Sequence, residues 1–376
     1  MTGVGRADAL VAEMLGILTR TREARQHPPA VERMLAESMS TAGILSEQLA
    51  ELQQFVILEA EEPDTNEMIQ ARTAWDQLPA DVDAKGVREL VLLSPTLSTL
   101  HRAAVTVTSV HRFGDEKLKM AAFMGQVAGR FPRYIGMLVP RPNDKFPGFF
   151  IDASELNGME RLLERLAHVG AIKDFKLLGQ FKNKEGKQYW KERSEVPKHR
   201  TAEKWRVLRG TVASDWEPFL TGHWLTAYAY QIARDQFERV GAAFEIYSNV
   251  RYSLPGDLGG GSSDVDVLVR TSDIVLSIEC KSGHVLTGQP SQASKTLRNA
   301  ERFDRILDTM EVSLKRIYQL LYLESDKEPA EDVSRAVTGG KVDLLVTMPR
   351  AVRLTVQRIA NGQSIDDYEQ IGAAEA

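Results

Sequence analysis

The chain has a single cysteine among its 376 residues, Cys280, so it forms no disulfide within itself and has no metal site made of several cysteines. It also lacks long apolar runs: no stretch approaches the ~18 uncharged residues of a membrane span. Residues 1–25 are interrupted by charge and lack the basic start and apolar core of a signal peptide. We therefore expect a cytoplasmic protein without a membrane partner.

The chain also lacks a large excess of either positive or negative charge, because its net charge is only −5. That value alone argues weakly against nucleic acid as a partner, but the charge is unevenly distributed. Residues 1–80 hold 6 Lys/Arg and 13 Asp/Glu, a net −7, whereas residues 172–209 hold 12 and 5, a net +7. Phosphate contacts need a local basic surface, so the basic segment keeps DNA or RNA as a candidate partner.

Size and composition indicate a folded protein of more than one domain. A chain of 376 residues exceeds the usual single domain, and 43% hydrophobic with 26% charged residues is ordinary for a globular protein with a sizeable core. We divide it into residues 1–85, 86–153, 154–204 and 205–376.

The first region, residues 1–85, is predicted to be helical. Residues 6–60 read as two helices, with an apolar stripe at helical spacing formed by Leu45, Leu49, Leu52 and Val56. They form either a helical hairpin packed on its own domain or a coiled-coil arm that would make a homodimer. Residues 61–85 read as a linker or a peripheral helix.

The middle of the chain gives less information. In the α/β region 86–153, to which the sequence assigns no role, residues 87–93 and 133–139 are consistent with strands and residues 115–131 with a helix. Residues 155–172 then predict a helix, with Gly170 placed where a C-terminal cap is expected.

A basic hairpin follows this helix, with its turn at residues 182–187. The combination indicates a winged-helix module over 154–204 or, equally, a plain helix and hairpin. Because the turn is rich in cations, we predict that Lys182, Lys184 and Lys187 bind nucleic acid.

The last region, 205–376, predicts an α/β core, α+β for the whole chain, in which a mixed sheet is flanked by helices. Residues 216–241 read as a long amphipathic helix, and residues 264–270 and 274–282 as two strands joined by a tight Thr-Ser-Asp turn. Residues 294–324 read as helical and residues 339–348 as a late strand.

Three charged residues stand on the two hairpin strands: Asp266, Glu279 and Lys281. Side chains alternate along a strand, so Glu279 and Lys281 share a face, and the hairpin brings Asp266 beside Glu279. Two carboxylates, with the backbone carbonyl of Cys280 between them, are hard oxygen ligands that suit Mg²⁺ or Mn²⁺. A neighbouring lysine can hold the water that attacks phosphorus. The alternative is a surface hairpin with a cross-strand ion pair.

The stretch 263–283, "SDVDVLVRTSDIVLSIECKSG", resembles the core of the PD-(D/E)xK nuclease superfamily, which includes restriction endonucleases and Holliday-junction resolvases. With "FLTGHWLTAYAY" before it, the region is similar, more narrowly, to the nuclease domain of CRISPR-associated effectors activated by cyclic oligonucleotides. The resemblance covers about residues 205–350. It implies a restriction-endonuclease-like sheet, an antiviral defence role, metal binding by Asp266 and Glu279, and activation of water by Lys281.

The sequence departs from this narrower family at one helix position. There the family has Glu after the Trp-Leu pair, and this chain has Thr226. The N-terminal half carries no pattern of a ring-nucleotide sensor, so activation by a cyclic nucleotide is not carried over.

Secondary candidates surround the proposed site. Asp264 shares a strand face with Asp266 and is either a further metal contact or a solvated residue, and Lys295 is a predicted phosphate contact. His223 and His284 lack the spacing of metal ligands. We expect a Mg²⁺-dependent endonuclease acting on DNA, RNA or both. The alternatives are a nuclease-like fold that binds without cutting and a structural subunit of a nucleic-acid-processing complex.

Overall fold

The computed structural model describes residues 38, 42, 65–79, 82, 84–102, 106–127, 132–135, 137–139, 148–197, 201–253, 263–282, 315–323, 344–346 and 349–363. The chain divides into two compact units, Met1–Asp64 and Thr65–Ala376. The elements below belong to the second unit. The helical hairpin and dimer arm predicted within 6–60 lie outside the described residues, apart from the helical Ser38 and Ala42.

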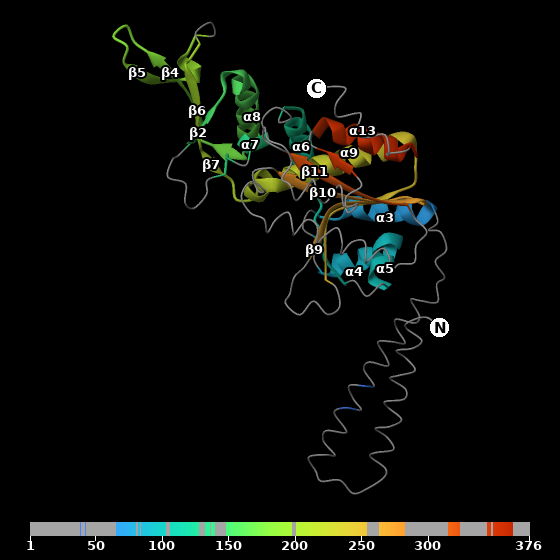
Figure 1. Cartoon of the computed structure of the whole chain (residues 1–376). Helices are drawn as coiled ribbons and strands as arrows, with labels where there is room; N and C mark the ends of the chain where they lie inside the picture. The colour runs from blue at the N-terminus through green and yellow to red at the C-terminus, as the bar shows by residue number, and fades with distance from the viewer. Residues whose placement is uncertain are drawn as a thin grey trace, which may run out of the picture. The chain divides into compact units, whose positions relative to one another are not determined.

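A six-stranded mixed sheet forms the centre of the second unit (Figure 1). In spatial order its strands are β1 (Thr106–Ser109), β8 (Glu245–Ser253), β9 (Ser263–Arg270), β10 (Ile274–Ser282), β11 (Lys315–Leu323) and β12 (Leu344–Val346). The pairs from β1 to β10 are antiparallel and those from β10 to β12 are parallel. The predicted α+β class with a mixed sheet flanked by helices is therefore confirmed.

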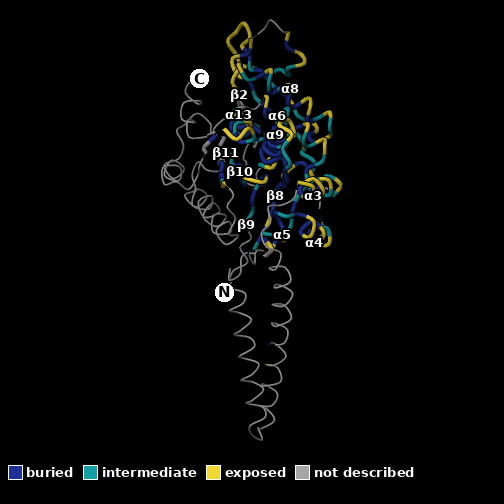
Figure 2. The backbone as a smooth tube through the Cα atoms, turned by 90° about the vertical axis from the view of Figure 1, so that its right-hand side faces the viewer, coloured by how far each residue is buried: buried dark blue, intermediate teal, exposed yellow. Residues whose placement is uncertain are grey.

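The long helix α9 (Trp224–Val240) packs against this sheet and continues from a π-helical turn, η4 (Phe219–His223). Its central residues are buried (Figure 2). It ends at Gly241, whose φ of 69° is the left-handed conformation that favours glycine at a helix terminus. The predicted helix is confirmed over residues 224–240 together with its end at Gly241, whereas residues 219–223 of the predicted span form the π-helical turn, with a kink at Gly222.

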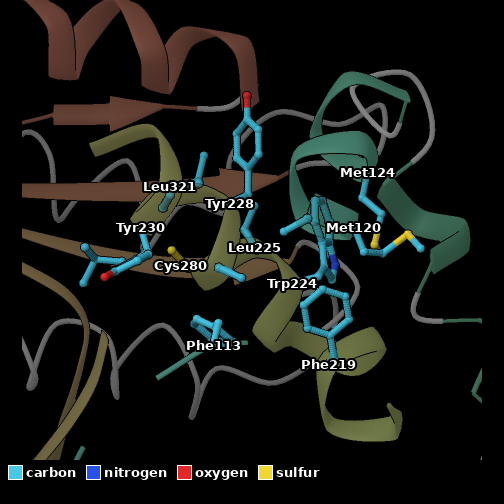
Figure 3. Packing of buried hydrophobic residues seen from close by; sticks show 14 of the residues in the cluster. Phe113, Met120, Met124, Phe219, Trp224, Leu225, Tyr228, Tyr230, Cys280 and Leu321 are labelled. Carbon is cyan, nitrogen blue, oxygen red and sulfur yellow. The ribbon is translucent and has the colours of Figure 1, made fainter. Parts of the chain in front are cut away.

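Two further helices pack on α9, α6 (Asp115–Val127) and α13 (Pro349–Ala360). Figure 3 shows Met120 and Met124 of α6 beside Trp224 of α9. The two helices approach so closely that a Cβ added at Gly125 would lie 2.1 Å from the Tyr228 ring. A glycine is therefore required at this crossing.

The helices α3 (Thr65–Gln77), α4 (Ala84–Leu93) and α5 (Pro95–Arg102) pack around the β1–β8 edge, and α4 and α5 lie across the sheet from α9 (Figure 1). The strand predicted over 87–93 is wrong: these residues lie in α4. Val87, Leu90 and Val91 are buried there, at spacings of three and four that suit a helix. The strand predicted over 133–139 is also wrong, because a short helix, α7 (Pro132–Ile135), and a turn occupy the described part of it.

A second sheet of four antiparallel strands follows in the chain. In spatial order its strands are β2 (Gly148–Ile151), β6 (Lys204–Leu208), β4 (Lys176–Lys182) and β5 (Gln188–Glu192). The predicted helix is present as α8 (Leu156–His168), and Gly170 has a left-handed φ of 73°. The predicted hairpin is β4–β5, but β2 and β6 extend it into a sheet.

The remaining short elements connect these layers. They are η2 (Ala153–Glu155), the two-stranded pair β3 (Ile172–Lys173) and β7 (Thr211–Val212), and η3 (Arg193–Glu195). The pairing of β3 with β7 joins the end of α8 to the segment that leads into η4.

One prediction in the last region is wrong. Residues 315–323, expected as the end of a helix, form β11, which pairs with β10 along its whole length. Parallel strands are covered on both faces, so they are apolar along a continuous run and give no alternating pattern. The late strand is confirmed as β12 at residues 344–346.

Candidate active site

The predicted hairpin places its three charged residues together. The β9–β10 register pairs Val267 with Ile278, and one further step sets Asp266 opposite Glu279. Thr271 closes the turn: its amide donates to the carbonyl of Ile274, and its hydroxyl accepts from the amides of Asp273 and Ile274. This local turn fixes the register and thereby the distance between the carboxylates.

Asp266 is held by neighbours on two elements. Its Oδ2 accepts the backbone N–H of Cys280 at 2.7 Å, and its Oδ1 accepts the Thr226 hydroxyl of α9 at 3.3 Å. The Lys281 Nζ lies 3.9 Å from Oδ2 and forms an ion pair with Glu279 Oε1. The lysine is thus the counterion of both carboxylates.

Burial governs the electrostatics of the site. The side chain of Glu279 is 3% exposed and that of Asp266 is 13% exposed. Loss of hydration raises the pKa of Glu279 to about 7, with the charge of Asp266 adding to the effect and Lys281 opposing it. Burial likewise raises the pKa of Asp266. Burial opposes the charge on Lys281, but the two carboxylates outweigh it and raise its pKa.

A polar cavity of about 420 Å³ opens beside these groups. Asp266, Cys280 and Lys281 line it, together with residues from β8, the end of β1, η4 and α9. Glu279 lies beneath this surface. The sequence did not indicate that His111, Asn249 and Arg251 line the cavity, because they come from segments without a recognisable motif.

Two histidines stand at the cavity with their rings 6.3 Å apart, His111 and His223. Ser248 holds the backbone of His111, whose amide donates to the Ser248 carbonyl and whose carbonyl accepts the Ser248 hydroxyl. Burial lowers the pKa of His223, although Asp266 opposes the shift. A neutral imidazole can either donate or accept a hydrogen bond from a bound ligand.

Asn249 has an unusual backbone for a strand residue, with a φ of 48°. Continuing the β8–β9 register sets it opposite Asp266. Its side-chain Nδ2 is buried and has no hydrogen-bond partner among the described residues. Strained residues with unsatisfied polar groups gather at functional sites. An asparagine within an otherwise β-favouring stretch was the signal in the sequence that could have identified it.

The donor set suits a divalent cation of the magnesium type. In the part of the chain that the structure describes, no group of three or more His, Cys, Asp or Glu side chains is arranged to bind a metal. The adjacent carboxylates of Asp266 and Glu279 remain, and Mg²⁺ is commonly bound by one or two carboxylates while it keeps several waters. The carboxylates face each other with raised pKa values, which a cation would relieve. The residues therefore fit such an ion.

Thr226 faces the site, at the helix position where the nuclease family that the sequence resembles has Glu. It is 2% exposed and donates to Asp266, so this helix position points at the carboxylates. Asp264, partly exposed at the start of β9, lies opposite Lys281 in the extended register and also lines the cavity.

The other predicted binding residues are elsewhere. Lys182, Lys184 and Lys187 are exposed together at the β4–β5 turn. Lys182 forms an ion pair with Glu203 at 2.9 Å and Lys187 with Glu185 at 3.6 Å. Lys295 lies outside the described residues.

Comparisons with known proteins gave likeness in structure only. No protein-family model and no curated protein matches the sequence. Two solved structures are similar at 12% identity over 70% of this chain: the protein VC1899 from Vibrio cholerae, with a TM-score of 0.39, and Can2 from Sulfobacillus thermosulfidooxidans, determined with cyclic tetra-adenylate, with a TM-score of 0.40. The chain spans 60% and 59% of their lengths. No described helix is long and apolar enough to cross a membrane.

Proposed function

We propose that the protein is a metal-dependent endonuclease that hydrolyses phosphodiester bonds of DNA or RNA. The observation that carries the proposal is the meeting of Asp266, Glu279 and Lys281 at one end of a hairpin, beside a polar cavity. Each of these groups is buried or partly buried, and burying a charge is costly unless the charge is paired or bound to a metal. Such groups beside a cavity are candidates for a functional site. The basis of the proposal is these residues, and not the likeness to Can2.

Each residue has a role that follows from its position. Asp266 and Glu279 would bind Mg²⁺ or Mn²⁺, with the Cys280 carbonyl as a further oxygen ligand. When bound, the ion would lower the pKa of a coordinated water and neutralise charge on the phosphoryl oxygens. Lys281, on the cavity surface, would orient that water. The Thr226 hydroxyl and the Cys280 amide hold the Asp266 carboxylate in one orientation.

A second function, binding nucleic acid without cleavage, is favoured by one observation. Thr226 occupies the position at which the resembling family places a carboxylate, and it offers Asp266 a hydroxyl instead. A site with fewer carboxylates attracts a divalent ion less strongly.

Cleavage assays separate the two functions. The purified protein is incubated with end-labelled single- and double-stranded DNA and RNA in Mg²⁺, in Mn²⁺ and in EDTA. We expect metal-dependent internal cuts by the parent, and their loss in Asp266→Asn, Glu279→Gln and Lys281→Ala. Glu89→Gln, which changes a carboxylate whose side chain is 60% exposed on α4, is the matched control and should cut like the parent.

The assignment of the site is wrong if all three site variants keep metal-dependent cutting. Retention of labelled nucleic acid by the parent without any cutting, in any of the metals, would favour the binding function instead.

A further inference from the structure

One face of the four-stranded sheet carries aromatic and basic side chains into solvent. Directly paired residues share a face, and the register aligns Phe150 of β2 with Arg206 of β6, and Trp190 of β5 with Gln180 of β4. The register also pairs Arg206 with Leu178 of β4, which lies two residues before Gln180 and therefore on the same face. The two pairs thus share one face of the sheet. The opposite face is buried and includes Phe149, Leu177, Phe181, Trp205 and Val207.

The two aromatic rings of the open face, Phe150 and Trp190, come from the two outer strands and meet above it. Their centroids are 6.1 Å apart, and they are 57% and 38% exposed. Their exposure contrasts with that of the other four tryptophans, Trp75, Trp205, Trp216 and Trp224, each at most 4% exposed. Large exposed aromatic side chains that meet on one surface indicate a binding site.

Basic groups surround the rings. The register places four basic residues on the same face: Lys176, Lys182, Lys204 and Arg206. It also places the acidic residue Glu192 there. Lys176 pairs with Glu192 and Lys182 with Glu203, whereas Lys204 is exposed. The Arg206 guanidinium lies 5.8 Å from the centre of the Phe150 ring. Its Nε is buried and has no hydrogen-bond partner among the described residues, and the residue as a whole is partly exposed on this face.

We propose that this face is a stacking platform for single-stranded nucleic acid, with bases lying on Phe150 and Trp190 and phosphates contacting Arg206 and Lys204. Flat rings beside cations match the two parts of a nucleotide, a π-face and an anion. The bases of a duplex are already stacked on one another, so only an unpaired strand can offer base faces to exposed rings. Nucleic acid as the ligand rests on the proposed function, whereas the choice of single strands comes from this face.

Binding is measured separately from cutting, by fluorescence anisotropy in EDTA with labelled oligo(dT), oligo(rU) and a duplex of equal length. We expect the Phe150→Ala/Trp190→Ala double variant to bind single strands at least about tenfold more weakly than the parent. Phe150→Tyr/Trp190→Phe, which keeps an aromatic ring at each of the two positions, should bind within about threefold of the parent. We expect the parent to prefer single strands over the duplex.

A matched control removes exposed apolar surface elsewhere. Leu92→Ala/Leu93→Ala changes two α4 side chains that are 69% and 50% exposed and should bind like the parent. Far-ultraviolet circular dichroism of every variant confirms that the fold is kept.

Trp190 also provides a direct reporter, because it is the exposed tryptophan. Oligo(dT) should quench part of the tryptophan emission of the parent, and the same titration should leave the emission of Trp190→Phe unchanged. A ring with only a structural role would show no quenching.

Three results would overturn the proposal: equal affinity of the parent and the double alanine variant, equal affinity for single strands and duplex, or binding of vesicles of anionic phospholipid that competes with oligo(dT) at this face. These results concern binding in EDTA, so they leave the cleavage function standing. Loss of cutting in the Asp266, Glu279 and Lys281 variants leaves the platform standing in the same way.

Discussion

Lys281 is the residue on which the charge balance of the candidate site depends. It forms an ion pair with Glu279, whose side chain is 3% exposed, and it lies 3.9 Å from Asp266, whose side chain is 13% exposed. The three charges are therefore unequal. Without Glu279 the lysine still has Asp266 and water, but without Lys281 the Glu279 carboxylate has no ion pair among the described residues.

Removal of these two partners should affect stability differently. In EDTA, Lys281→Ala should lower the free energy of unfolding by up to about 3 kcal/mol, because it leaves a buried carboxylate unpaired. Glu279→Gln should stay within about 1 kcal/mol of the parent, since it relieves repulsion from Asp266 while it frees the lysine. Urea unfolding followed by circular dichroism measures both. Equal losses in the two variants would contradict this account of the ion pair.

At the scale of the elements, the helix α9 contacts η4, α6, α13 and the strands β8, β9 and β10. Its Arg234 makes a bidentate ion pair with Asp76 of α3 at 2.8 Å for each bond, and its Tyr230 accepts a hydrogen bond from Trp75 at 2.8 Å. Trp75 also packs edge-on against Tyr247 of β8, with ring centroids 5.3 Å apart. Through these contacts α3 is fixed to the helix and to the sheet that carry the site.

The crossing of α6 and α9 depends on the absence of a side chain at Gly125. Gly125→Ala would place a methyl group 2.1 Å from the Tyr228 ring and should cost about 1–3 kcal/mol of stability by overpacking. Gly114→Ala, at the residue before α6, is the control: no atom lies within 4 Å of a Cβ built there, so it adds no overpacking. It should cost at most about 1 kcal/mol, because alanine is a weaker helix N-cap than glycine. Thermal unfolding compares the two. Similar melting temperatures would show that the helices can separate at no cost.

The stability of the whole molecule should depend on pH through a second buried acid, Glu245. It is fully buried at the start of β8, where its Oε2 accepts hydrogen bonds from the Ser94 hydroxyl and the Thr96 amide, each at 3.1 Å. Burial raises the pKa of Glu245 from 4.5 to about 7. A raised pKa means that the folded state binds the proton more tightly than the unfolded state does. The stability that this proton contributes is therefore complete below pH 4.5 and is lost as the pH rises to about 7.

Glu245→Gln tests this dependence. The amide keeps an acceptor for Ser94 and Thr96 without the charge, so the variant should exceed the parent at about pH 8, by as much as about 3 kcal/mol, and match it at about pH 4.5. Denaturant titrations across this range measure the difference, with Glu89→Gln, which changes an exposed carboxylate of α4, as the control. A difference that does not change with pH would contradict the raised pKa.

Long-range charge is also a property of the whole molecule, and it should appear in the salt dependence of binding. Lys182 and Lys187 already pair with glutamates, whereas Lys184 has no ion pair within the described residues. Replacing all three with Ala should therefore reduce the log–log salt slope for a single strand by about 0.7, the value for one phosphate contact, and not by about 2. Lys85→Ala, on α4, is the control. An unchanged slope would show that this turn does not touch phosphate.

The sequence by itself determined the local parts of the protein. The tight turn at 271–273 and the alternation on either side of it specify the β9–β10 hairpin, and with it the meeting of Asp266, Glu279 and Lys281. The periodic helices α8 and α9 follow in the same way from residues a few positions apart. Such features depend on neighbours in the chain, so they can be predicted from the chain.

Only the tertiary structure decided the rest. The burial of β11 on both faces removes the alternation that identifies a strand, and the short β1 joins the sheet through pairing with residues more than 140 positions away. The contact of Thr226 with Asp266, the position of Asn249 and the meeting of Phe150 with Trp190 each join segments distant in sequence. A single sequence carries no signal for these contacts, because they arise when separate elements pack together and bury shared surface.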